Sequence, residues 1–235
     1  MARVLRRLTL FTVLATVATA LTVLPATPAA AATLPGGFVL RDIETGLTGL
    51  TTTGIGDGFT DFAFLPDESL LVIGKYGKVV YAPKSGTPRQ IAMLPTNGGG
   101  DLGLTGLALA PDFAMTRTVY TARAVHKTGE GTGAMGVLRV SRWTATTDET
   151  GAPTGLTGEQ IVVETYADGS IHGISGLVAA DDGTLWITIG DSANLGVTTR
   201  ALRAQNLDDP HGKVLHVNPD GSGVPGNPYY DPASP

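Results

Sequence analysis

Short runs of apolar residues alternate with polar turns along most of the chain. Three of these runs share one order, in which a strand-like segment is followed by an aspartate turn and a second strand-like segment. The turn aspartates are Asp67, Asp112 and Asp182. Because two strands joined by a short turn pair in antiparallel fashion, the pattern predicts a series of hairpins. The predicted strands cover residues 62–65, 70–73, 78–81, 107–110, 118–122, 137–144, 174–178 and 184–189, with a weaker strand at 38–40 and loops at 127–136 and 144–158.

The spacing of the turns indicates a repeated unit. Asp67 and Asp112 are 45 residues apart, which matches one propeller blade, and the 70 residues from Asp112 to Asp182 fit a blade with an insertion. No helical pattern of ten or more residues occurs after residue 32. The sequence therefore predicts an all-β fold made of repeated four-stranded units, a β-propeller. A β-sandwich with a similar number of strands is the alternative, and the repeated aspartate turn favours the propeller.

The third hairpin carries the candidate chemistry. His172 lies just before its first strand, and Asp191 follows its second strand. In an antiparallel hairpin these two positions lie at the same end, so the carboxylate can hold the imidazole. A histidine oriented by an aspartate is a common general base near neutral pH. The alternative is that Gly190-Asp191 is an ordinary turn and that His172 is a solvated side chain.

Composition narrows the class of protein. The chain has 235 residues, of which 42% are hydrophobic and only 16% are charged, so we expect one folded domain rather than disorder. With 32 glycines and 15 prolines, short strands and tight turns are favoured over helices. The net charge of −5 argues against nucleic acid and anionic membranes as partners. The chain has no cysteine, so it forms no disulfides, and its stability must come from burial of its core, to which a bound metal can add.

Residues 1–32 have the organisation of a signal peptide. Arg3, Arg6 and Arg7 form a basic start, an apolar run follows, and Ala30-Ala31-Ala32 offers a cleavage site before Thr33. A transmembrane anchor is the alternative, but threonines and prolines interrupt the run. We therefore expect a secreted protein without membrane insertion after cleavage, with residues 33–235 as the mature portion.

Several short motifs in a fixed order resemble the glucose/sorbosone dehydrogenase family of soluble, pyrroloquinoline quinone (PQQ)-dependent sugar dehydrogenases. The first group comprises His172, Leu177, Asp182-Gly183 and Thr188-Ile189-Gly190-Asp191. The second comprises Ala204-Gln205-Asn206-Leu207, Gly212-Lys213-Val214-Leu215 and Asn218-Pro219-Asp220-Gly221.

The resemblance implies a six-bladed propeller that binds PQQ and calcium. It further implies oxidation of a sugar at its C1 hydroxyl to a lactone, with His172 as base, Asp191 as its holder and an external electron acceptor. Residues 33–235 are long enough for three to four blades, so we expect the N-terminal part of a longer protein, an open ring, and a fragment that is inactive alone. The family's main PQQ and calcium ligands come from later blades. Accordingly no cofactor ligand or metal ligand is predicted here: Lys213 is expected to be structural, Arg200 and Arg203 to line a surface loop, and His126, His211 and His216 to be ordinary residues.

Two positions depart from the family pattern. Asp101 stands where the family has a glutamine or glutamate that points to the sugar, so it is either a substrate contact or a loop carboxylate satisfied by backbone N–H groups. Gly176 stands where the family has an arginine. These departures keep a second function open, that of a non-catalytic secreted propeller that binds carbohydrate or protein.

Overall fold

The computed structural model describes residues 35–39, 43, 45, 47, 58–126, 136–192 and 201–231. The chain divides into two compact units, Met1–Asp42 and Ile43–Pro235. In the first unit, Phe38 donates its N–H to the carbonyl of Pro35, and neither Phe38 nor Val39 is in a strand. The predicted strand at 38–40 is therefore wrong at these two residues, whose side chains are exposed and gain no burial from pairing. The predicted signal peptide, Arg200 and most of the loop at 127–136 lie outside the described residues.

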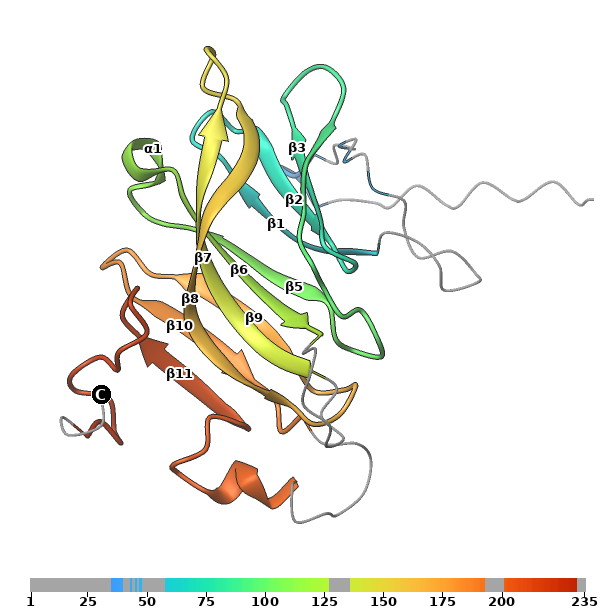
Figure 1. Cartoon of the computed structure of the whole chain (residues 1–235). Coiled ribbons are helices and arrows are strands. Elements are labelled where there is room, and N and C mark those ends of the chain that lie inside the picture. Colours follow the sequence, from blue (N-terminus) through green and yellow to red (C-terminus); the bar gives the residue numbers. More distant parts are fainter. Residues whose placement is uncertain are drawn as a thin grey trace, which may run out of the picture. The chain divides into compact units, whose positions relative to one another are not determined.

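The described residues of the second unit form three antiparallel sheets, each made of strands that follow one another in the sequence (Figure 1). The first sheet matches the predicted hairpins and adds a fourth strand, which the sequence pattern did not reveal. That strand is only five residues long, begins with the polar pair Arg89-Gln90, and exposes or half-exposes every residue. The strands, in spatial order, are β1 (Phe59–Phe64), β2 (Leu70–Gly74), β3 (Lys78–Ala82) and β4 (Arg89–Met93).

The second sheet contains the longest strands of the described chain. Its members are β5 (Leu104–Leu109), β6 (Thr118–Val125), β7 (Gly136–Thr147) and β8 (Pro153–Ala167), with a short helix α1 (Phe113–Thr116) after β5. The predicted loop at 144–158 is wrong, because β7 and β8 continue through it as a hairpin. Only a tight turn separates them, in which Asp148 accepts the backbone N–H groups of Thr150 and Ala152.

The third sheet has the order β11–β10–β9. Its strands are β9 (Ile174–Ala179), β10 (Leu185–Ile189) and β11 (Lys213–Val217), and a short 3₁₀ helix, η1 (Ala201–Gln205), precedes β11. The hairpin of β9 and β10 is the one predicted to carry His172 and Asp191. Within the described residues, no helix has the length and apolar character needed to cross a membrane.

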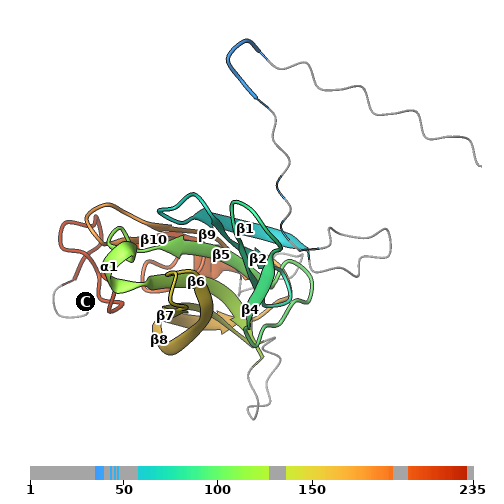
Figure 2. The ribbon, with the colours of Figure 1, turned by 90° about the horizontal axis from the view of Figure 1, so that it is seen from above.

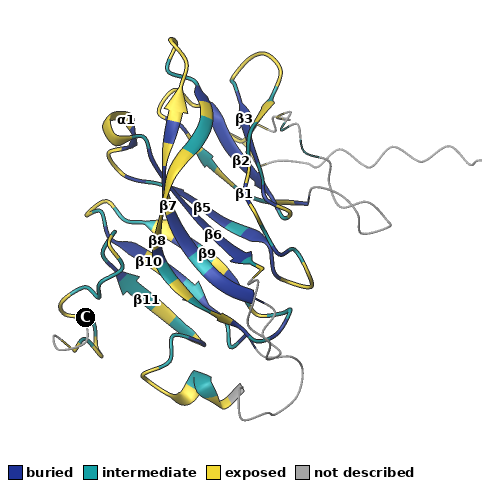
Figure 3. Ribbon diagram, viewed as in Figure 1, coloured by how far each residue is buried: buried dark blue, intermediate teal, exposed yellow. Residues whose placement is uncertain are grey.

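The sheets pack face to face through two apolar cores. One core joins the first and second sheets around Ile73, Leu104 and Trp143, and the other joins the second and third sheets around Val140 and Ile187. The strands β2, β3 and β6 are accordingly buried almost throughout, whereas the far end of the β7–β8 hairpin is exposed (Figure 3). Seen from above, β1, β5 and β9 lie next to one another in the series of sheets (Figure 2). This is the arrangement of consecutive propeller blades, and the described residues form three blades of an incomplete ring, as predicted.

Two of the three aspartate turns share one local interaction. Asp67 accepts hydrogen bonds from the backbone N–H and the hydroxyl of Ser69, and Asp182 does the same with Thr184. These bonds hold the pKa of each carboxyl below its ordinary value of 3.8, the hydroxyl bond being the main cause. Asp112 differs, because it begins the helix α1 rather than a tight turn.

Candidate active site

The first strands of the three sheets share a bulge that turns one side chain out of the ladder. Pairing skips Thr60 in β1, Thr105 in β5 and Ser175 in β9, each the second residue of its strand. Bulges of this kind redirect side chains and are frequent beside functional sites. All three hydroxyl residues line the same cleft.

The sequence signal for these hydroxyl residues is a repeated tetrad. Each strand opens with an apolar residue, a hydroxyl residue, a glycine or aspartate, and another apolar residue, eight positions before the turn aspartates. These hydroxyl residues are not among the candidates predicted from the sequence, because an uncharged hydroxyl lacks the charge or metal affinity that marks an acid, a base or a metal ligand. The tetrads are Phe59-Thr60-Asp61-Phe62, Leu104-Thr105-Gly106-Leu107 and Ile174-Ser175-Gly176-Leu177.

The bulged threonines connect neighbouring sheets. The Thr60 hydroxyl donates to the carbonyl of Leu104 at 2.7 Å, and the Thr105 hydroxyl donates to the carbonyl of Ile174, also at 2.7 Å. In addition, the carboxylate of Asp61 accepts the N–H of Leu107 at 2.9 Å. The first strands are therefore joined by polar contacts at the end where the cleft opens.

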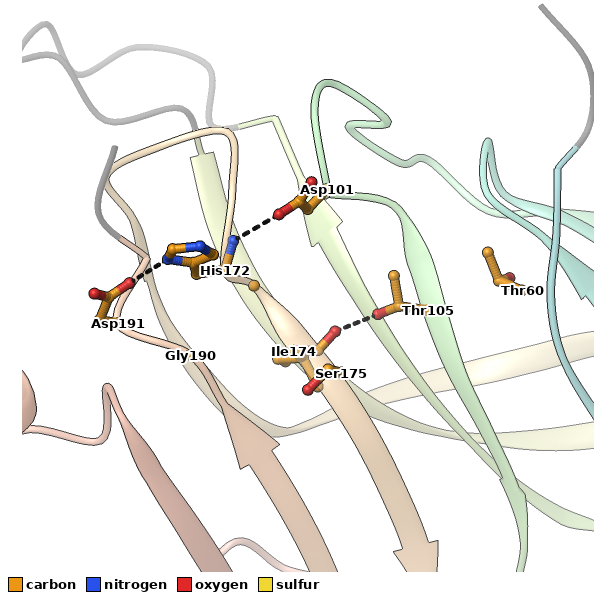
Figure 4. Close-up of a pocket in the computed structure, with 9 residues that line it drawn as sticks. Thr60, Asp101, Thr105, His172, Ile174, Ser175, Gly190 and Asp191 are labelled. Atoms are coloured by element: carbon orange, nitrogen blue, oxygen red, sulfur yellow. Dashed lines mark hydrogen bonds and ion pairs between the residues drawn. The ribbon is translucent and has the colours of Figure 1, made fainter. Parts of the chain in front are cut away.

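The cleft has a volume of about 610 Å³. It lies at the ends of β1, β5 and β9 and receives His172 and Asp191 from the third sheet and Asp101 from the turn before β5 (Figure 4). Its charged or ionisable side chains are these three, and no lysine or arginine lines it among the described residues. The lining consists of Thr60, Asp101, Thr105, His172, Gly173, Ile174, Ser175, Gly190 and Asp191.

The structure brings His172 and Asp191 together, as the hairpin geometry predicts. Nδ1 of His172 lies 2.7 Å from Oδ1 of Asp191 (Figure 4). Because a carboxylate only accepts hydrogen bonds, this contact places the proton of a neutral imidazole on Nδ1 and leaves the lone pair on Nε2. The His172 side chain is 48% exposed and that of Asp191 is 31% exposed, so the pair faces the cleft rather than the core. The pair can therefore accept a proton from a molecule in the cleft.

The backbone around His172 is tightly constrained. His172 has φ = 55°, in the left-handed region that residues with side chains seldom adopt. Its carbonyl accepts the N–H of the fully buried Ser192 at 3.1 Å. Gly190 passes so close that a Cβ atom there would lie 2.4 Å from the His172 carbonyl oxygen, which explains the glycine.

The structure places Asp101 against residues 170–174, which are called the His172 segment below. Its N–H donates to the carbonyl of Ser170 at 2.8 Å, and Oδ2 of its carboxylate accepts the N–H of His172 at 3.3 Å. Of the two roles expected for Asp101, the observed contacts are those of a carboxylate bonded to backbone N–H. Gly176, at the position of the family's arginine, pairs with Thr188 within the hairpin.

The other residues singled out from the sequence that the structure describes are not part of the cleft lining. Nζ of Lys213 donates to the carbonyls of Ala204 and His211, which is the structural role expected. The expectation of a surface-loop role for Arg203 is wrong, because it lies in η1, half-buried, and pairs with Asp168 and Asp209. The two carboxylates compensate the charge of the Arg203 guanidinium, which can therefore be partly buried instead of lying in solvent.

A buried histidine belongs to the same ionic network. His211 is 1% exposed, and its ring nitrogens contact Oδ1 of Asp209 at 2.6 Å and the carbonyl of Tyr166 at 2.7 Å. Burial by itself raises the pKa of Asp209, but the hydrogen bonds from His211 and the charge of Arg203 hold it below its ordinary value. The described residues contain no cluster of three or more histidines and acids suited to a metal ion.

Solved structures resemble this fold. The PQQ-bound form of aldose sugar dehydrogenase from Streptomyces coelicolor is 27% identical, with a TM-score of 0.64, over 84% of this chain and 52% of that chain. An oxidoreductase (glucose dehydrogenase) from Thermus thermophilus is 28% identical, with a TM-score of 0.61, over 80% of this chain and 50% of that chain. Aldose sugar dehydrogenase from Escherichia coli, in the apo form, is 19% identical, with a TM-score of 0.55, over 76% of this chain and 49% of that chain. At this level of identity the likeness shows the fold alone.

The chain thus spans about half the length of these structures. The model of the glucose/sorbosone dehydrogenase family matches residues 59–234, which include all three sheets and the cleft with its His172–Asp191 pair. With the family model covering most of the sequence, the chain belongs to the glucose/sorbosone dehydrogenase family.

Proposed function

We propose that the protein containing this chain is a PQQ-dependent dehydrogenase that oxidises an aldose or related sugar at its C1 hydroxyl to a lactone. The observation that carries the proposal is the 2.7 Å contact between Nδ1 of His172 and Asp191 at the mouth of the cleft. Membership of the family and the likeness to a PQQ-bound aldose sugar dehydrogenase support it. The residues given roles are His172 as the base and Asp191 as the group that holds it.

His172 would take the proton of the C1 hydroxyl on Nε2. Nδ1–H of His172 donates a hydrogen bond to Asp191, which fixes the tautomer that leaves Nε2 basic, and the charge of Asp191 stabilises the imidazolium that forms. The cleft is open enough for a sugar to reach Nε2, since nearly half of the His172 side-chain surface is exposed. Loss of the hydroxyl proton would make C1 a hydride donor, and its oxidation to the lactone carbonyl requires a hydride acceptor that the described cleft residues do not supply.

The chemistry that PQQ supplies when bound is a quinone that accepts hydride. PQQ carries three carboxylates, which require arginine or lysine partners. The described cleft lining offers carboxylates, hydroxyls and an imidazole but no such cation, so these residues alone do not fit the cofactor. We therefore assign neither PQQ nor calcium ligands to this chain and propose that later parts of the protein provide them.

The proposal also covers the substrate, the electron acceptor and the location of the protein. The substrate is a small sugar, and the electrons pass to an external acceptor. The signal-peptide pattern of residues 1–32 supports a location outside the cell.

The test is dye-linked oxidation of a panel of aldoses by the full-length protein, with and without added PQQ and calcium. His172→Ala should reduce kcat by about 10²–10⁴-fold while PQQ still binds, because the base is lost and the cofactor ligands are not. His126→Ala is the matched control, since His126 is exposed and does not line the cleft. Normal turnover in His172→Ala would refute the role of the base. An inactive protein that binds sugars but no PQQ would instead identify a carbohydrate-binding propeller.

A further inference from the structure

The backbone conformation of His172 needs an external restraint. At φ = 55° the residue lies in a region that its side chain disfavours, so the conformation persists only where neighbouring groups hold it. Ser192 secures the carbonyl side of His172 and has a left-handed backbone itself, with φ = 52°. The amide side faces a different sheet, and the group bonded to it there is Asp101.

The turn before β5 is pressed against the His172 segment. A Cβ atom on Gly100 would lie 2.1 Å from the carbonyl oxygen of Ser170, so the two backbones are in direct contact. At the next position, Asp101 bonds to this segment twice, through its N–H to Ser170 and through Oδ2 to the N–H of His172. Figure 4 shows the Asp101 carboxylate directed at the His172 backbone nitrogen.

The other side of the His172 segment is fixed by the same sheet. The Thr105 hydroxyl donates to the carbonyl of Ile174 at 2.7 Å, two residues beyond His172. Contacts from Asp101, at residues 170 and 172, and from Thr105, at residue 174, therefore fix the position of His172 relative to the second sheet. Of these contacts, the one from the Asp101 carboxylate is made to His172 itself.

We propose that Asp101 is a positioning residue that holds His172 in its left-handed conformation, with the ring directed at Asp191, and that it acts through this backbone contact rather than by binding the sugar. The inference rests on the proposed function for its kinetic consequence, but the conformational claim stands on the contacts alone. A carboxylate is suited to this role because it accepts a backbone N–H strongly and needs no donor in return.

The experiment compares Asp101→Ala and Asp101→Asn in the full-length protein. Asp101→Ala removes the acceptor, whereas the amide oxygen of Asp101→Asn can still receive the His172 N–H. Asp181→Ala is the control, because Asp181 is exposed in a hairpin turn outside the cleft lining. We expect Asp101→Ala to lower kcat by about 10–100-fold with KM changed by less than about threefold, since displacing a catalytic group by about 1 Å can cost about 10²-fold. Asp101→Asn should recover most of that loss.

A second readout does not depend on turnover. The rate at which diethyl pyrocarbonate modifies His172, followed by mass spectrometry, should change in Asp101→Ala and return in Asp101→Asn, with His126 as the internal reference. An increase in KM at unchanged kcat in both variants would overturn the proposal in favour of a sugar contact. Unchanged reactivity of His172 in Asp101→Ala would also overturn it. Because this assay needs no turnover, it tests the role of Asp101 even if the wild-type protein oxidises no sugar, and that second result would refute only the proposed function.

Discussion

Replacement of Gly190 by alanine is the sharpest test of how His172 is packed. The new Cβ atom would lie 2.4 Å from the His172 carbonyl oxygen, 2.8 Å from its carbonyl carbon and 2.9 Å from its Cβ atom. All three contacts are too short, and two involve backbone, so no rotamer change relieves them. Gly190 does not have a positive φ, and the substitution therefore adds a clash without adding backbone strain of its own.

The size of the clash sets the expected effect. To reach 3.0 Å, the shortest separation that real Cβ atoms show, the two segments must part by about 0.6 Å. Overpacking of this kind costs about 1–3 kcal/mol of unfolding free energy. The displacement falls on His172, the proposed base, so kcat should decrease by about 10–100-fold.

The assay is dye-linked sugar oxidation combined with urea unfolding of the full-length protein. Gly99→Ala is the matched control, because its Cβ atom would meet only the side-chain oxygen of Asn97, at 3.3 Å. It should keep wild-type stability to within about 1 kcal/mol. A Gly190→Ala protein with wild-type stability and turnover would show that the His172 backbone does not lie against Gly190 and would refute the reasoning.

Further predictions concern charge and stability. Glu159→Ala should lower the unfolding free energy by about 3 kcal/mol, because it leaves the guanidinium of Arg123, whose side chain is 1% exposed, without its carboxylate 2.6 Å away. Glu164→Ala, at the surface partner of Arg139, should cost less than about 1 kcal/mol, and equal losses in urea unfolding would contradict this view. Stability should also fall in acid: burial alone raises the pKa of Glu159, but hydrogen bonds from Ser141 and Arg123 hold it below its ordinary 4.5. Its contribution is complete above pH 4.5 and is lost as pH falls through the lower folded-state pKa, so Glu159→Gln should flatten the pH dependence of urea unfolding below about pH 5.

The parts of the fold that the sequence predicted are those in which a buried strand produces a run or an alternation of apolar residues. Strands with a buried face, such as β2 and β10, follow apolar runs that end at turns, and the His172–Asp191 contact follows from hairpin geometry. Strands with little burial were missed: β4 is short, begins with two polar residues and has no fully buried position, and β8 is exposed along much of its length because it lies at the edge of its sheet. Their pairing is determined by the neighbouring strand rather than by their own residues.

Only the His172–Asp191 part of the candidate site could be predicted from the sequence, for a related reason. His172 and Asp191 are near each other along the hairpin, whereas Asp101 contacts His172 across 71 residues of sequence. Similarly, the bulge that turns Thr105 towards Ile174 depends on the packing of two sheets. Contacts between sheets leave no periodicity in either segment, so residue types alone left the role of Asp101 open between sugar and backbone.

The order of the sheets along the chain has a consequence for how the site is assembled as the protein is made. Each sheet consists of consecutive strands, so it can form from a local stretch of chain soon after that stretch leaves the ribosome. His172 differs, since its backbone is held by Asp101, which is made earlier, and by Ser192, which is made later. The first two sheets would thus provide a template, and the base would acquire its conformation only when the β9–β10 hairpin closes against it. Folding of the scaffold and maturation of the site are therefore separable events in time.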